Sequence, residues 1–464
     1  MRIADLAGLR VAIWGYGREG RAALLALRRR LPELTATLIG SAAERMQAQA
    51  DLDAACGGDA AGTLQWLAAP PDAAVLSAFD VVIKSPGISA WLPDLLDARR
   101  NGTRFTSGTA LWFAEHPQAR VIAVTGTKGK STTTALIAHL LRGLGRRVAL
   151  AGNIGLPLLE LVDPPQPPDW WVIELSSFQT GEAGPLAVGV VTRLDEEHLD
   201  WHGSRERYVA DKLRLADAAR VLVVNAQQPE LLRLTERHGD RRTFAHAAGW
   251  HASDAGIARG AAEIAPRAAL ALPGPHNVLN ACAALAAVEA AGEDAIAAAA
   301  ALPRFRPLPH RLQWLGESEG LGYVDDSIAT TPQAVLEALG SLPDPARATL
   351  IVGGHERGLD WQPFAQAVRL RPPQAIVVNG ANAARIGAVL RETGGDYQLQ
   401  VVARLADAIA AARACTPPGG TIVLSPGAPS FDQFRDYAER GRAFAALAGF
   451  DPDAIGSIEG LGIA

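Results

Sequence analysis

A short apolar run that leads directly into a glycine-rich loop is the feature that most limits how this chain can fold. Residues 121–124 (VIAV) precede residues 125–132 (TGTKGKST), and apolar residues then recur at helical spacing. Strand, loop and helix in this order are typical of a phosphate-binding loop, whose backbone N–H groups point at phosphate oxygens. Lys130 would place a positive charge on the β- and γ-phosphates, and Ser131 could bind Mg²⁺. The loop therefore predicts a nucleotide site.

Strand-like and helix-like segments alternate along nearly the whole chain of 464 residues, which predicts an α/β fold with parallel sheets. We expect three domains: a Rossmann-like domain at residues 1–106, a central phosphate-loop domain at 107–306 and a second Rossmann-like domain at 307–464. The proline-rich stretch 303–309 would be a hinge before the third domain. The predicted strands are residues 10–14, 36–39, 81–84, 121–124, 171–174, 188–192, 221–225, 322–325, 349–352, 375–379 and 421–425.

The composition excludes several classes of protein. A net charge of −5 leaves no broad basic surface for nucleic acid. No apolar run approaches the roughly 18 residues of a membrane span, and the N-terminus has no apolar signal-peptide core. The three cysteines lie far apart, without the spacing of a metal site or a disulfide framework. We therefore expect a cytoplasmic protein that binds neither nucleic acid nor membrane.

A second glycine pattern lies near the start of the chain. Gly15, Gly17 and Gly20 have the G-x-G-x-x-G spacing of a dinucleotide-binding turn, directly after the first predicted strand. A nicotinamide site would need an acid at the end of the second strand, about 20 residues further on, to hold the ribose. Here the nearest acid is Glu44, beyond the end of that strand. A nicotinamide-dependent dehydrogenase is therefore disfavoured, which leaves a diphosphate site or a purely structural turn.

Acidic residues follow two of the predicted central strands. Glu174 ends the apolar run 170–173, where it could bind a metal beside the phosphate loop or be an ordinary acid at a strand end. Residues 193–203 (RLDEEHLDWHG) could face the same phosphates or form a solvated acidic loop. Ser204 is a possible N-cap for the helix that follows, and this helix carries Lys212.

Several motifs occur in one order and together resemble a known family. They are GTKGKST (126–132), GNIG (152–155), ELSSFQ (174–179), EEHLDWHG (196–203), the helix with Lys212, PGPHNVLNA (273–281), LPHR (308–311) and DDS (325–327). The chain as a whole resembles the Mur ligases of peptidoglycan synthesis, and within them the glutamate-adding, MurD-type members. The resemblance implies a first domain that binds a UDP-linked substrate, a second that binds ATP, and a third that closes over the nucleotide and the amino acid.

The resemblance implies roles for residues of the nucleotide site. Catalytic roles fall on Lys130, Glu174, His198, Lys212, Arg311 and Asp326. ATP would be bound by Gly126, Thr127, Lys128, Gly129, Lys130, Ser131, Thr132, Asn277, Asn280, Arg311 and Asp326. Two Mg²⁺ ions would be held by Ser131, Glu174, His198 and Lys212. The lysine would be carbamylated to N6-carboxylysine, because a carbamate offers the anionic oxygen ligands that Mg²⁺ prefers.

The resemblance also implies two further substrates, UDP-N-acetylmuramoyl-L-alanine and glutamate, and a monomeric enzyme. The uridine diphosphate would be held by Gly15, Gly17, Arg18, Glu19, Ser85 and Gly87. Asn153 would contact the acceptor substrate, and Ser176 and His198 would also bind substrate. The incoming amino acid would face Ile328, Thr330, Arg357, Ser430, Phe431 and Tyr437.

Two departures from the family pattern concern the amino acid that is added. Members that add D-glutamate have lysines where this chain has Ile328 and Arg357. The motifs DSI-x-TTP, WGYGREGRAA and GTALWFAEH resemble instead a smaller branch that adds L-glutamate, whose product a separate epimerase then inverts. We therefore expect L-glutamate, with D-glutamate as the alternative.

The implied reaction moves the γ-phosphoryl group of ATP to a carboxylate, and the amine of glutamate then attacks the acyl phosphate. Two other classes share part of the sequence pattern. A folylpolyglutamate-type ligase has a similar phosphate loop but usually lacks an N-terminal glycine-turn domain. A non-catalytic nucleotide-binding switch would bind ATP without releasing phosphate in the presence of an acceptor.

Overall fold

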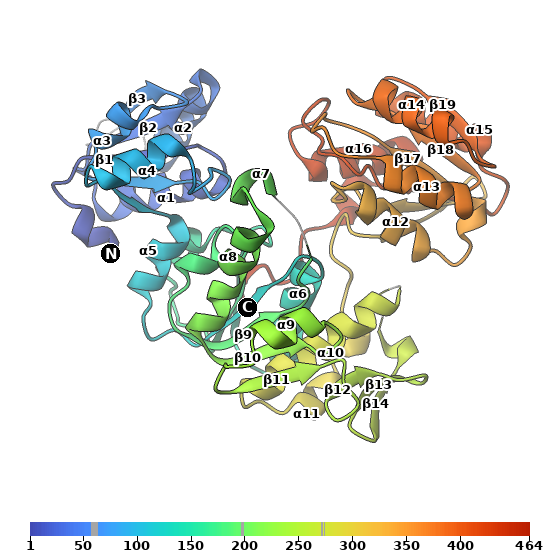
Figure 1. Ribbon diagram of the computed structural model, residues 1–464, viewed down its shortest axis with the longest axis horizontal. Coiled ribbons are helices and arrows are strands. Elements are labelled where there is room, and N and C mark those ends of the chain that lie inside the picture. Colours follow the sequence, from blue (N-terminus) through green and yellow to red (C-terminus); the bar gives the residue numbers. More distant parts are fainter. Residues whose placement is uncertain (57–63, 196–198, 271, 273) are drawn as a thin grey trace. The chain divides into compact units, whose positions relative to one another are not determined.

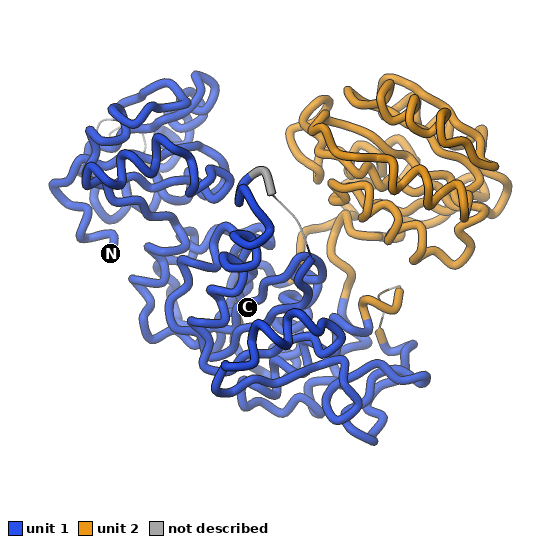
Figure 2. The backbone as a smooth tube through the Cα atoms, viewed as in Figure 1, with its two compact units in different colours: residues 1–269, 278–305, 460–464 blue, residues 270–277, 306–459 orange. Residues whose placement is uncertain are grey.

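The computed structural model of the protein describes residues 1–56, 64–195, 199–270, 272 and 274–464. The chain divides into two compact units (Figure 2). Unit 1 comprises residues 1–269, 278–305 and 460–464, and unit 2 comprises residues 270–277 and 306–459. Both units combine helices with largely parallel sheets, which confirms the predicted α/β fold class. The break after Phe305 lies inside the predicted hinge 303–309.

The first sheet of unit 1 has five strands in the order β3-β2-β1-β4-β5, all of them parallel (Figure 1). β1 and β4 are buried along their whole length, because helices cover both faces of the sheet. The strand order reverses at β1, so a ligand crevice is expected beyond the carboxyl ends of β1 and β4. The elements are β1 (Val11–Trp14), α1 (Arg18–Arg30), β2 (Ala36–Gly40), α2 (Ala42–Cys56), β3 (Leu64–Ala68), α3 (Ala73–Ser77), β4 (Val81–Lys84), α4 (Pro93–Arg100) and β5 (Arg104–Thr106).

The central sheet of unit 1 has ten strands in the order β14-β13-β12-β11-β10-β9-β6-β8-β7-β21. Its strands are parallel from β12 to β7, and antiparallel pairs occur only at the two ends of this sheet. The elements are α5 (Gly108–Glu115), β6 (Val121–Thr125), α6 (Lys130–Gly143), β7 (Val148–Gly152), β8 (Trp170–Glu174), β9 (Leu186–Val191), α7 (Leu199–His202), α8 (Arg205–Ala218), β10 (Ala219–Asn225), α9 (Pro229–Leu234), β11 (Arg241–Phe244), β12 (Trp250–Ala252), β13 (Gly256–Arg259), β14 (Ala262–Pro266), α10 (Pro275–Ala290), α11 (Ala295–Ala299) and β21 (Gly462–Ile463).

Helix α5 joins the cores of the two sheets in unit 1. Trp112 on this helix is fully buried, and the centre of its ring lies 4.6 Å from that of Trp171 in β8. One continuous cluster of buried side chains includes Trp112, Ile13 of the first sheet and Ile173 of the central sheet. Because the two sheets share this cluster, they form one compact unit instead of two.

The strand β21 returns to unit 1 from beyond unit 2 in the sequence. Gly462 and Ile463 pair antiparallel with Leu150 and Ala149 of β7. Arg142 on α6 secures the segment, because its Nη2 atom donates to the carbonyl oxygen of Gly460 at 2.7 Å. Apart from β21, each of the ranges 1–106, 107–306 and 307–464 contains the strands of one sheet, and the limits of the three domains stay a prediction.

Unit 2 contains a sheet of six strands in the order β15-β16-β20-β17-β18-β19. β15 is antiparallel and the other strands are parallel. Helices α12, α13 and α14 cover one face of this sheet, and α15 and α16 cover the other. The elements are β15 (Gln313–Ser318), β16 (Leu321–Asp325), α12 (Pro332–Gly340), β17 (Ala348–Val352), α13 (Gln362–Leu370), β18 (Ala375–Val378), α14 (Ala383–Thr393), β19 (Gln398–Val401), α15 (Leu405–Cys415), β20 (Thr421–Leu424) and α16 (Tyr437–Ala448).

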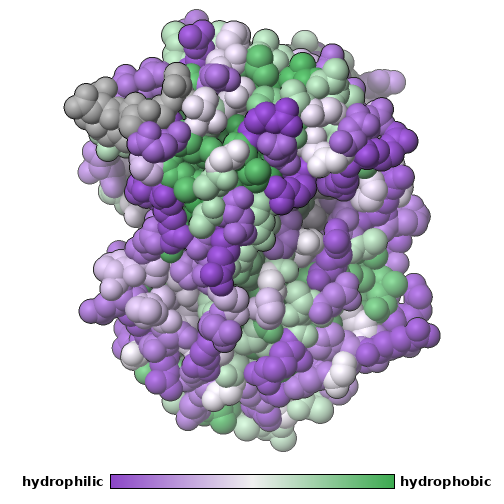
Figure 3. Space-filling model, turned by 90° about the vertical axis from the view of Figure 1, so that its left-hand side faces the viewer, coloured by the Kyte–Doolittle hydropathy of each residue, from purple (hydrophilic) through white to green (hydrophobic). Residues whose placement is uncertain are grey.

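The surface is mixed in character. Figure 3 shows one face of the molecule, on which hydrophilic residues surround smaller hydrophobic areas. None of the helices in the described part of the chain is both long enough and apolar enough to cross a membrane.

The glycine turn after β1 generates a prediction about stability. A Cβ atom at Gly20 would lie 2.1 Å from the carbonyl oxygen of Gly15, whereas one at Gly17 would have no neighbour within 4 Å. We expect Gly20→Ala to lower the free energy of unfolding by about 1–3 kcal/mol, because the backbone must move to admit the methyl group. Urea unfolding followed by circular dichroism would measure the change. Gly17→Ala is the matched control, and equal losses in both variants would contradict the steric explanation.

Candidate active site

The phosphate loop lies at the carboxyl end of β6, where the strand passes into α6. Gly129, the N-cap of α6, has a φ of +84°, a left-handed conformation that glycine adopts without strain. Lys130 Nζ donates hydrogen bonds to the backbone oxygens of Gly126 (2.8 Å) and Thr127 (3.2 Å), so the side chain folds back over the loop. The loop thus combines an ammonium group with a helix N-terminus, an arrangement that favours anions.

Residues that follow β9 hold the phosphate loop in place. Thr192 Oγ1 donates to the carbonyl oxygen of Lys128 at 2.6 Å. The backbone N–H of Thr127 donates to the carbonyl oxygen of Arg193 at 2.7 Å. The approach is so close that a Cβ atom at Gly126 would lie 2.0 Å from Thr192 Oγ1. The predicted phosphate loop is therefore shaped by the neighbouring strand as well as by its own glycines.

Helix α10 brings a predicted adenine-side residue to the phosphate loop. Asn280 Oδ1 lies 2.4 Å from the position that a Cβ atom at Gly129 would take, and it accepts a hydrogen bond from Thr133 Oγ1 at 3.5 Å. Asn277, nearly one turn earlier on α10, is buried. Ser131 is half-buried and Thr132 is buried in the first turn of α6.

Glu174 ends β8 beside the phosphate loop, because the parallel pairing of β6 with β8 places it opposite Val124. Its side chain is buried, with only 1% of the residue exposed. Oε1 accepts a hydrogen bond from Asn153 Nδ2 at 2.8 Å, whereas Oε2 has no hydrogen-bond partner among the described residues. A buried carboxylate oxygen without a donor is costly unless a cation meets it. The residues present therefore fit the predicted Mg²⁺ site.

Lys212 lies on α8 close to the phosphate loop and is 2% exposed. Its Nζ atom is 4.8 Å from the centre of the Tyr208 ring, and the Tyr208 hydroxyl lies 2.7 Å from Thr127 Oγ1. The predicted metal ligand His198 lies outside the described residues. Within the described ranges, no group of three or more His, Cys, Asp or Glu residues could hold a metal. The predicted metal ligands are instead the carboxylate of Glu174, the hydroxyl of Ser131, the imidazole of His198 and a carbamylated Lys212.

The Gly15 turn and the Ser85 loop lie side by side at the carboxyl ends of β1 and β4. Gly15 has a φ of +86°, and Ser85 Oγ donates to its carbonyl oxygen at 3.0 Å. Gly17 is the N-cap of α1, so this helix N-terminus begins in the turn. Gly87, in the same loop as Ser85, borders open space. The structure brings together the residues predicted to hold a diphosphate, at the carboxyl ends of the strands where the strand order reverses.

Glu44 belongs to this turn although the sequence places it beyond β2. Its Oε1 atom accepts a hydrogen bond from the backbone N–H of Tyr16, and its Oε2 atom accepts one from that of Ser41, both at 2.7 Å. The carboxylate therefore fixes the glycine turn and the start of α2.

Arg18 and Glu19 connect the glycine turn with the central sheet. Arg18 Nη1 donates to the carbonyl oxygen of Gly155 at 3.3 Å, in the predicted GNIG loop. Burial, together with the nearby carboxylate of Glu182, raises the pKa of Glu19 to about 7. A residue predicted to bind substrate thus carries a carboxyl group that changes its charge near neutral pH.

Asp326 follows β16 at the carboxyl edge of the sheet in unit 2. Its carboxylate accepts hydrogen bonds from Ser425 Oγ at 2.8 Å and from the backbone N–H of Leu312 at 3.2 Å. Burial raises the pKa of Asp326 to about 7. The neighbouring Asp325 Oδ2 lies 2.7 Å from Nδ1 of His310. The predicted DDS and LPHR motifs therefore meet in one hydrogen-bonded network.

Arg440 on α16 holds together the loops predicted to face the amino acid. Its buried guanidinium donates to Ser327 Oγ (3.0 Å) and to the carbonyl oxygens of Ala428 (3.0 Å) and Pro429 (3.1 Å). These bonds join the loop after β16 to the loop after β20. Of the residues predicted for unit 2, Asp326 and Ser430 are buried, Arg311, Ile328, Thr330 and Tyr437 are half-buried, and Arg357 and Phe431 are exposed.

Known proteins match the chain along its whole length. The model of the Mur ligase middle domain matches residues 124–288, and that of the Mur ligase glutamate ligase domain matches residues 310–428. A protein named UDP-N-acetylmuramoyl-L-alanine--L-glutamate ligase, from Xanthomonas euvesicatoria pv. vesicatoria (strain 85-10), is 50% identical to this chain. The alignment spans 477 residues, gaps included, and covers all of both chains. The chain belongs to the Mur ligase family.

Other relatives of this Mur ligase are more distant. A protein of the same name from Salinispora tropica is 38% identical over 468 residues, which cover 96% of this chain and 98% of its own. The crystal structure of MurF ligase from Thermotoga maritima in complex with ADP is similar in fold, with a TM-score of 0.59 and 16% identity over 93% of this chain and 99% of that one. The sequence relatives confirm the family resemblance, the solved structure shows a similar fold, and the roles of individual residues stay predictions.

The sequence does not reveal the structural role of three residues that shape the site of this Mur ligase. They are Glu44, Tyr208 and Arg440, and each contacts a segment far away in the sequence. Only Tyr208 carried a usable signal, because it precedes Lys212 by four residues and so lies on the same face of α8. Glu44 and Arg440 belong to no phosphate-loop or strand-end pattern.

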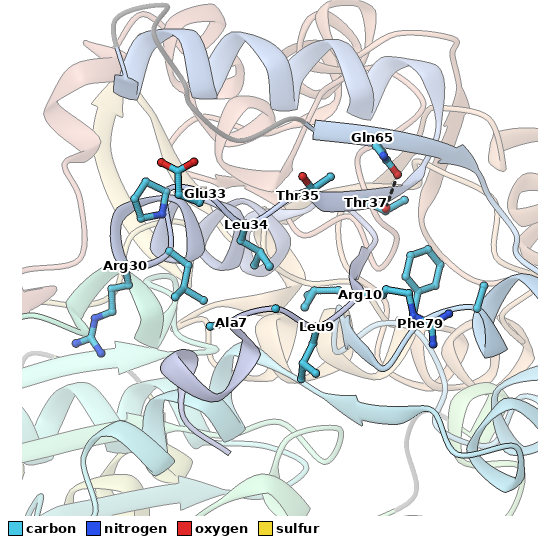
Figure 4. A pocket seen from close by; sticks show the side chains of 15 residues that line it. Ala7, Leu9, Arg10, Arg30, Glu33, Leu34, Thr35, Thr37, Gln65 and Phe79 are labelled. Carbon is cyan, nitrogen blue, oxygen red and sulfur yellow. Dashed lines mark hydrogen bonds between the residues drawn. The ribbon is translucent and has the colours of Figure 1, made fainter.

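A pocket of about 690 Å³ lies at the opposite edge of the first sheet, near the amino ends of β1 and β2 (Figure 4). Phe79 contributes an apolar wall. Three of its polar lining residues have partners in the protein: Arg10 forms an ion pair with Asp80 at 2.7 Å, and Thr37 Oγ1 donates to Gln65 Oε1 at 3.5 Å. The pocket is separate from the diphosphate turn, which lies at the carboxyl ends of the strands.

Glu19 generates a prediction about pH. Its carboxyl pKa is about 7 in the folded protein against 4.5 as the ordinary value, so between these pH values the unfolded chain loses a proton that the folded chain keeps. Glu19 therefore lowers the free energy of unfolding progressively as the pH rises from 4.5 toward 7, and it has no such effect well below pH 4.5. We expect Glu19→Gln to be more stable than the parent by on the order of 1–3 kcal/mol at about pH 8, and the gain to vanish near pH 4.

Chemical unfolding of both proteins over this pH range would measure the difference. Glu160→Gln is the matched control, because Glu160 is an exposed glutamate near Glu19. A stability gain in Glu19→Gln that does not change with pH would contradict the explanation.

Proposed function

We propose that this Mur ligase joins L-glutamate to UDP-N-acetylmuramoyl-L-alanine at the expense of ATP, in the cytoplasmic synthesis of peptidoglycan precursors. The observation that carries the proposal is the 50% identity, over both full lengths, to a protein that is named for this activity. The arrangement of a phosphate loop, a buried carboxylate and a diphosphate turn within unit 1 supports it. We also propose that the enzyme is a monomer and that a separate epimerase acts on its product.

The acceptor carboxylate must be activated, because its delocalised charge makes it a poor electrophile. Transfer of the γ-phosphoryl group of ATP to a carboxylate oxygen gives an acyl phosphate and ADP. The amine nitrogen of glutamate then attacks the acyl carbon, and the tetrahedral adduct loses a proton and expels phosphate to leave an amide. Lys130 and the N–H groups at the start of α6 would stabilise the charge on the phosphoryl group during the first transfer.

The metal ligands in this proposal are Ser131, Glu174, His198 and carbamylated Lys212. Mg²⁺ held by these residues would neutralise charge on the phosphoryl and carboxylate oxygens. The Oε2 atom of Glu174, which is buried without a donor among the described residues, supports the first of two sites. The burial of Lys212 beside the phosphate loop supports its conversion to N6-carboxylysine, which would add an anionic oxygen ligand there.

Unit 2 would supply the glutamate site and additional contacts to ATP. Arg357 is exposed in the loop after β17, and a planar guanidinium can bind a carboxylate through two parallel hydrogen bonds. Ile328 gives the neighbouring loop an apolar side chain where members that add D-glutamate have an ammonium group. These two residues are the basis for preferring L-glutamate. Asn277, Arg311 and Asp326 would reach the nucleotide from the same unit.

The first prediction of the proposal concerns the amino acid. Purified protein with Mg-ATP, bicarbonate and UDP-N-acetylmuramoyl-L-alanine should release phosphate when L-glutamate is added and should not do so with D-glutamate. A colorimetric phosphate assay and the mass of the product would follow the reaction. Turnover with D-glutamate alone would leave the ligase class intact and overturn the assignment of the glutamate site. Silence with both isomers would overturn the proposed function.

The second prediction concerns the phosphate loop. Lys130→Ala should lower kcat by about 100- to 1,000-fold, because the variant lacks the charge that stabilises the transferring phosphoryl group. Phosphate release under saturating substrates would measure kcat, and circular dichroism would show that the variant is folded. Turnover near the parent value in a folded Lys130→Ala protein would exclude Lys130 from catalysis.

A further inference from the structure

A buried chain of hydrogen bonds runs through Ser177, His202 and Asp211. Ser177 Oγ lies 2.9 Å from Nε2 of His202, and Nδ1 of the same ring lies 2.8 Å from Asp211 Oδ2. His202 has no exposed surface, and Ser177 is 5% exposed. An aspartate carboxylate oxygen accepts, so the Nδ1–H of His202 donates to Asp211, and its Nε2 is hydrogen-bonded to the hydroxyl of Ser177. The ring is therefore held from both sides.

The two ends of this chain lie next to residues of the proposed metal site. Ser177 is three residues after Glu174, in the loop that follows β8. Asp211 directly precedes Lys212 on α8, and its carbonyl oxygen accepts a hydrogen bond from Thr180 Oγ1 at 2.6 Å. His202 thus connects the loop after Glu174 with the helix that carries Lys212.

The same chain also reaches the loop proposed to hold the diphosphate. Asp211 Oδ2 accepts a second hydrogen bond from Trp91 Nε1 at 3.4 Å. Next to His202, Trp201 Nε1 donates to the carbonyl oxygen of Pro86 at 3.0 Å, and Ser89 Oγ donates to the carbonyl oxygen of Trp201 at 2.6 Å. Residues 85–91, in the loop after β4, are therefore attached to α7 and α8.

Aromatic packing fixes the His202 ring in this position. The centre of the ring lies 4.5 Å from that of Trp201, 5.2 Å from that of Tyr208 and 5.6 Å from that of Phe178. The Tyr208 hydroxyl contacts Thr127 of the phosphate loop at 2.7 Å. His202 is thus packed between the segments that carry the proposed phosphate, metal and diphosphate sites.

We propose that His202 is a positioning residue that sets the mutual placement of three segments: residues 85–91, residues 174–180 and helix α8. This inference rests on the proposed function only in that the proposed function assigns the diphosphate and metal sites to these segments. His202 does not touch a substrate, since it is fully buried. The same burial argues that the Ser177–His202–Asp211 chain is no nucleophilic triad, because Ser177 has almost no exposed surface. A displacement of about 1 Å in a phosphoryl-transfer site can cost about 100-fold in rate.

The variant His202→Phe tests the proposal, because it keeps an aromatic ring of similar size and removes both hydrogen bonds. We expect kcat to fall by about 10- to 100-fold and KM for UDP-N-acetylmuramoyl-L-alanine to rise, because the metal and diphosphate segments lose their common anchor. KM for glutamate should stay within about two-fold, because the glutamate site is proposed for unit 2. His202→Asn, which keeps a donor to Asp211, should recover part of kcat. A fall in kcat with both KM values unchanged would point to a loss of folded protein and overturn the proposal.

Hydrogen exchange measured by mass spectrometry provides a readout that does not depend on turnover. In His202→Phe, we expect faster exchange in peptides from residues 85–92 and 175–182. The matched control is His116→Phe, because His116 also packs against aromatic rings and hydrogen-bonds a backbone oxygen, that of Val162, at 2.9 Å. Exchange that is unchanged from the parent, or equally faster in the control, would overturn the positioning role. Faster exchange in His202→Phe alone, in a protein that shows no glutamate-dependent turnover, would uphold that role and reject the proposed function.

Discussion

The parallel pairing of β6 with β8 is the interaction on which the site of unit 1 depends. Its register places Glu174 opposite Val124, so the carboxylate leaves the sheet beside the phosphate loop that follows β6. The next strand, β7, ends at Gly152 and adds Asn153, whose amide meets one oxygen of Glu174. A shift of one residue would turn Glu174 to the other face of the sheet. The apolar side chains of these fully buried strands therefore form the core and, by fixing the register, also determine the position of the Glu174 carboxylate.

Much of the fold could be predicted because its parallel strands are short apolar runs buried on both faces. Residues 81–84 illustrate this, since the expected strand and β4 coincide. The strand β21 could not be predicted, because Gly462 and Ile463 are too few to show a periodicity. Its existence depends on the open edge of β7, which lies more than 300 residues earlier in the sequence. Local patterns reveal strands that form the centre of a sheet better than strands that complete its edge.

The candidate site divides in the same way. Lys130 and Glu174 could be predicted because Lys130 closes the glycine loop after one recognisable strand and Glu174 ends another, and the structure places both at one edge of the sheet. Arg440 could not be predicted, because it joins the loops after β16 and β20, which approach each other only after unit 2 has folded. The role of Glu44 could not be predicted either, because the sequence shows only an acid beyond β2 and cannot show that the first turn of α2 returns it to Tyr16. Residues that bind the backbone of distant segments leave no spacing to detect.

The pairing of β21 with β7 has a consequence for the order in which the chain can mature on the ribosome. A strand at the edge of a sheet presents unpaired N–H and C=O groups. β7 is synthesised early, but its partner β21 follows the whole of residues 306–459. The central sheet therefore keeps an open edge throughout the synthesis of unit 2, and unit 1 cannot be finished before unit 2 has been made. Although domains generally fold from the N-terminus onward during synthesis, here the earlier unit is completed last.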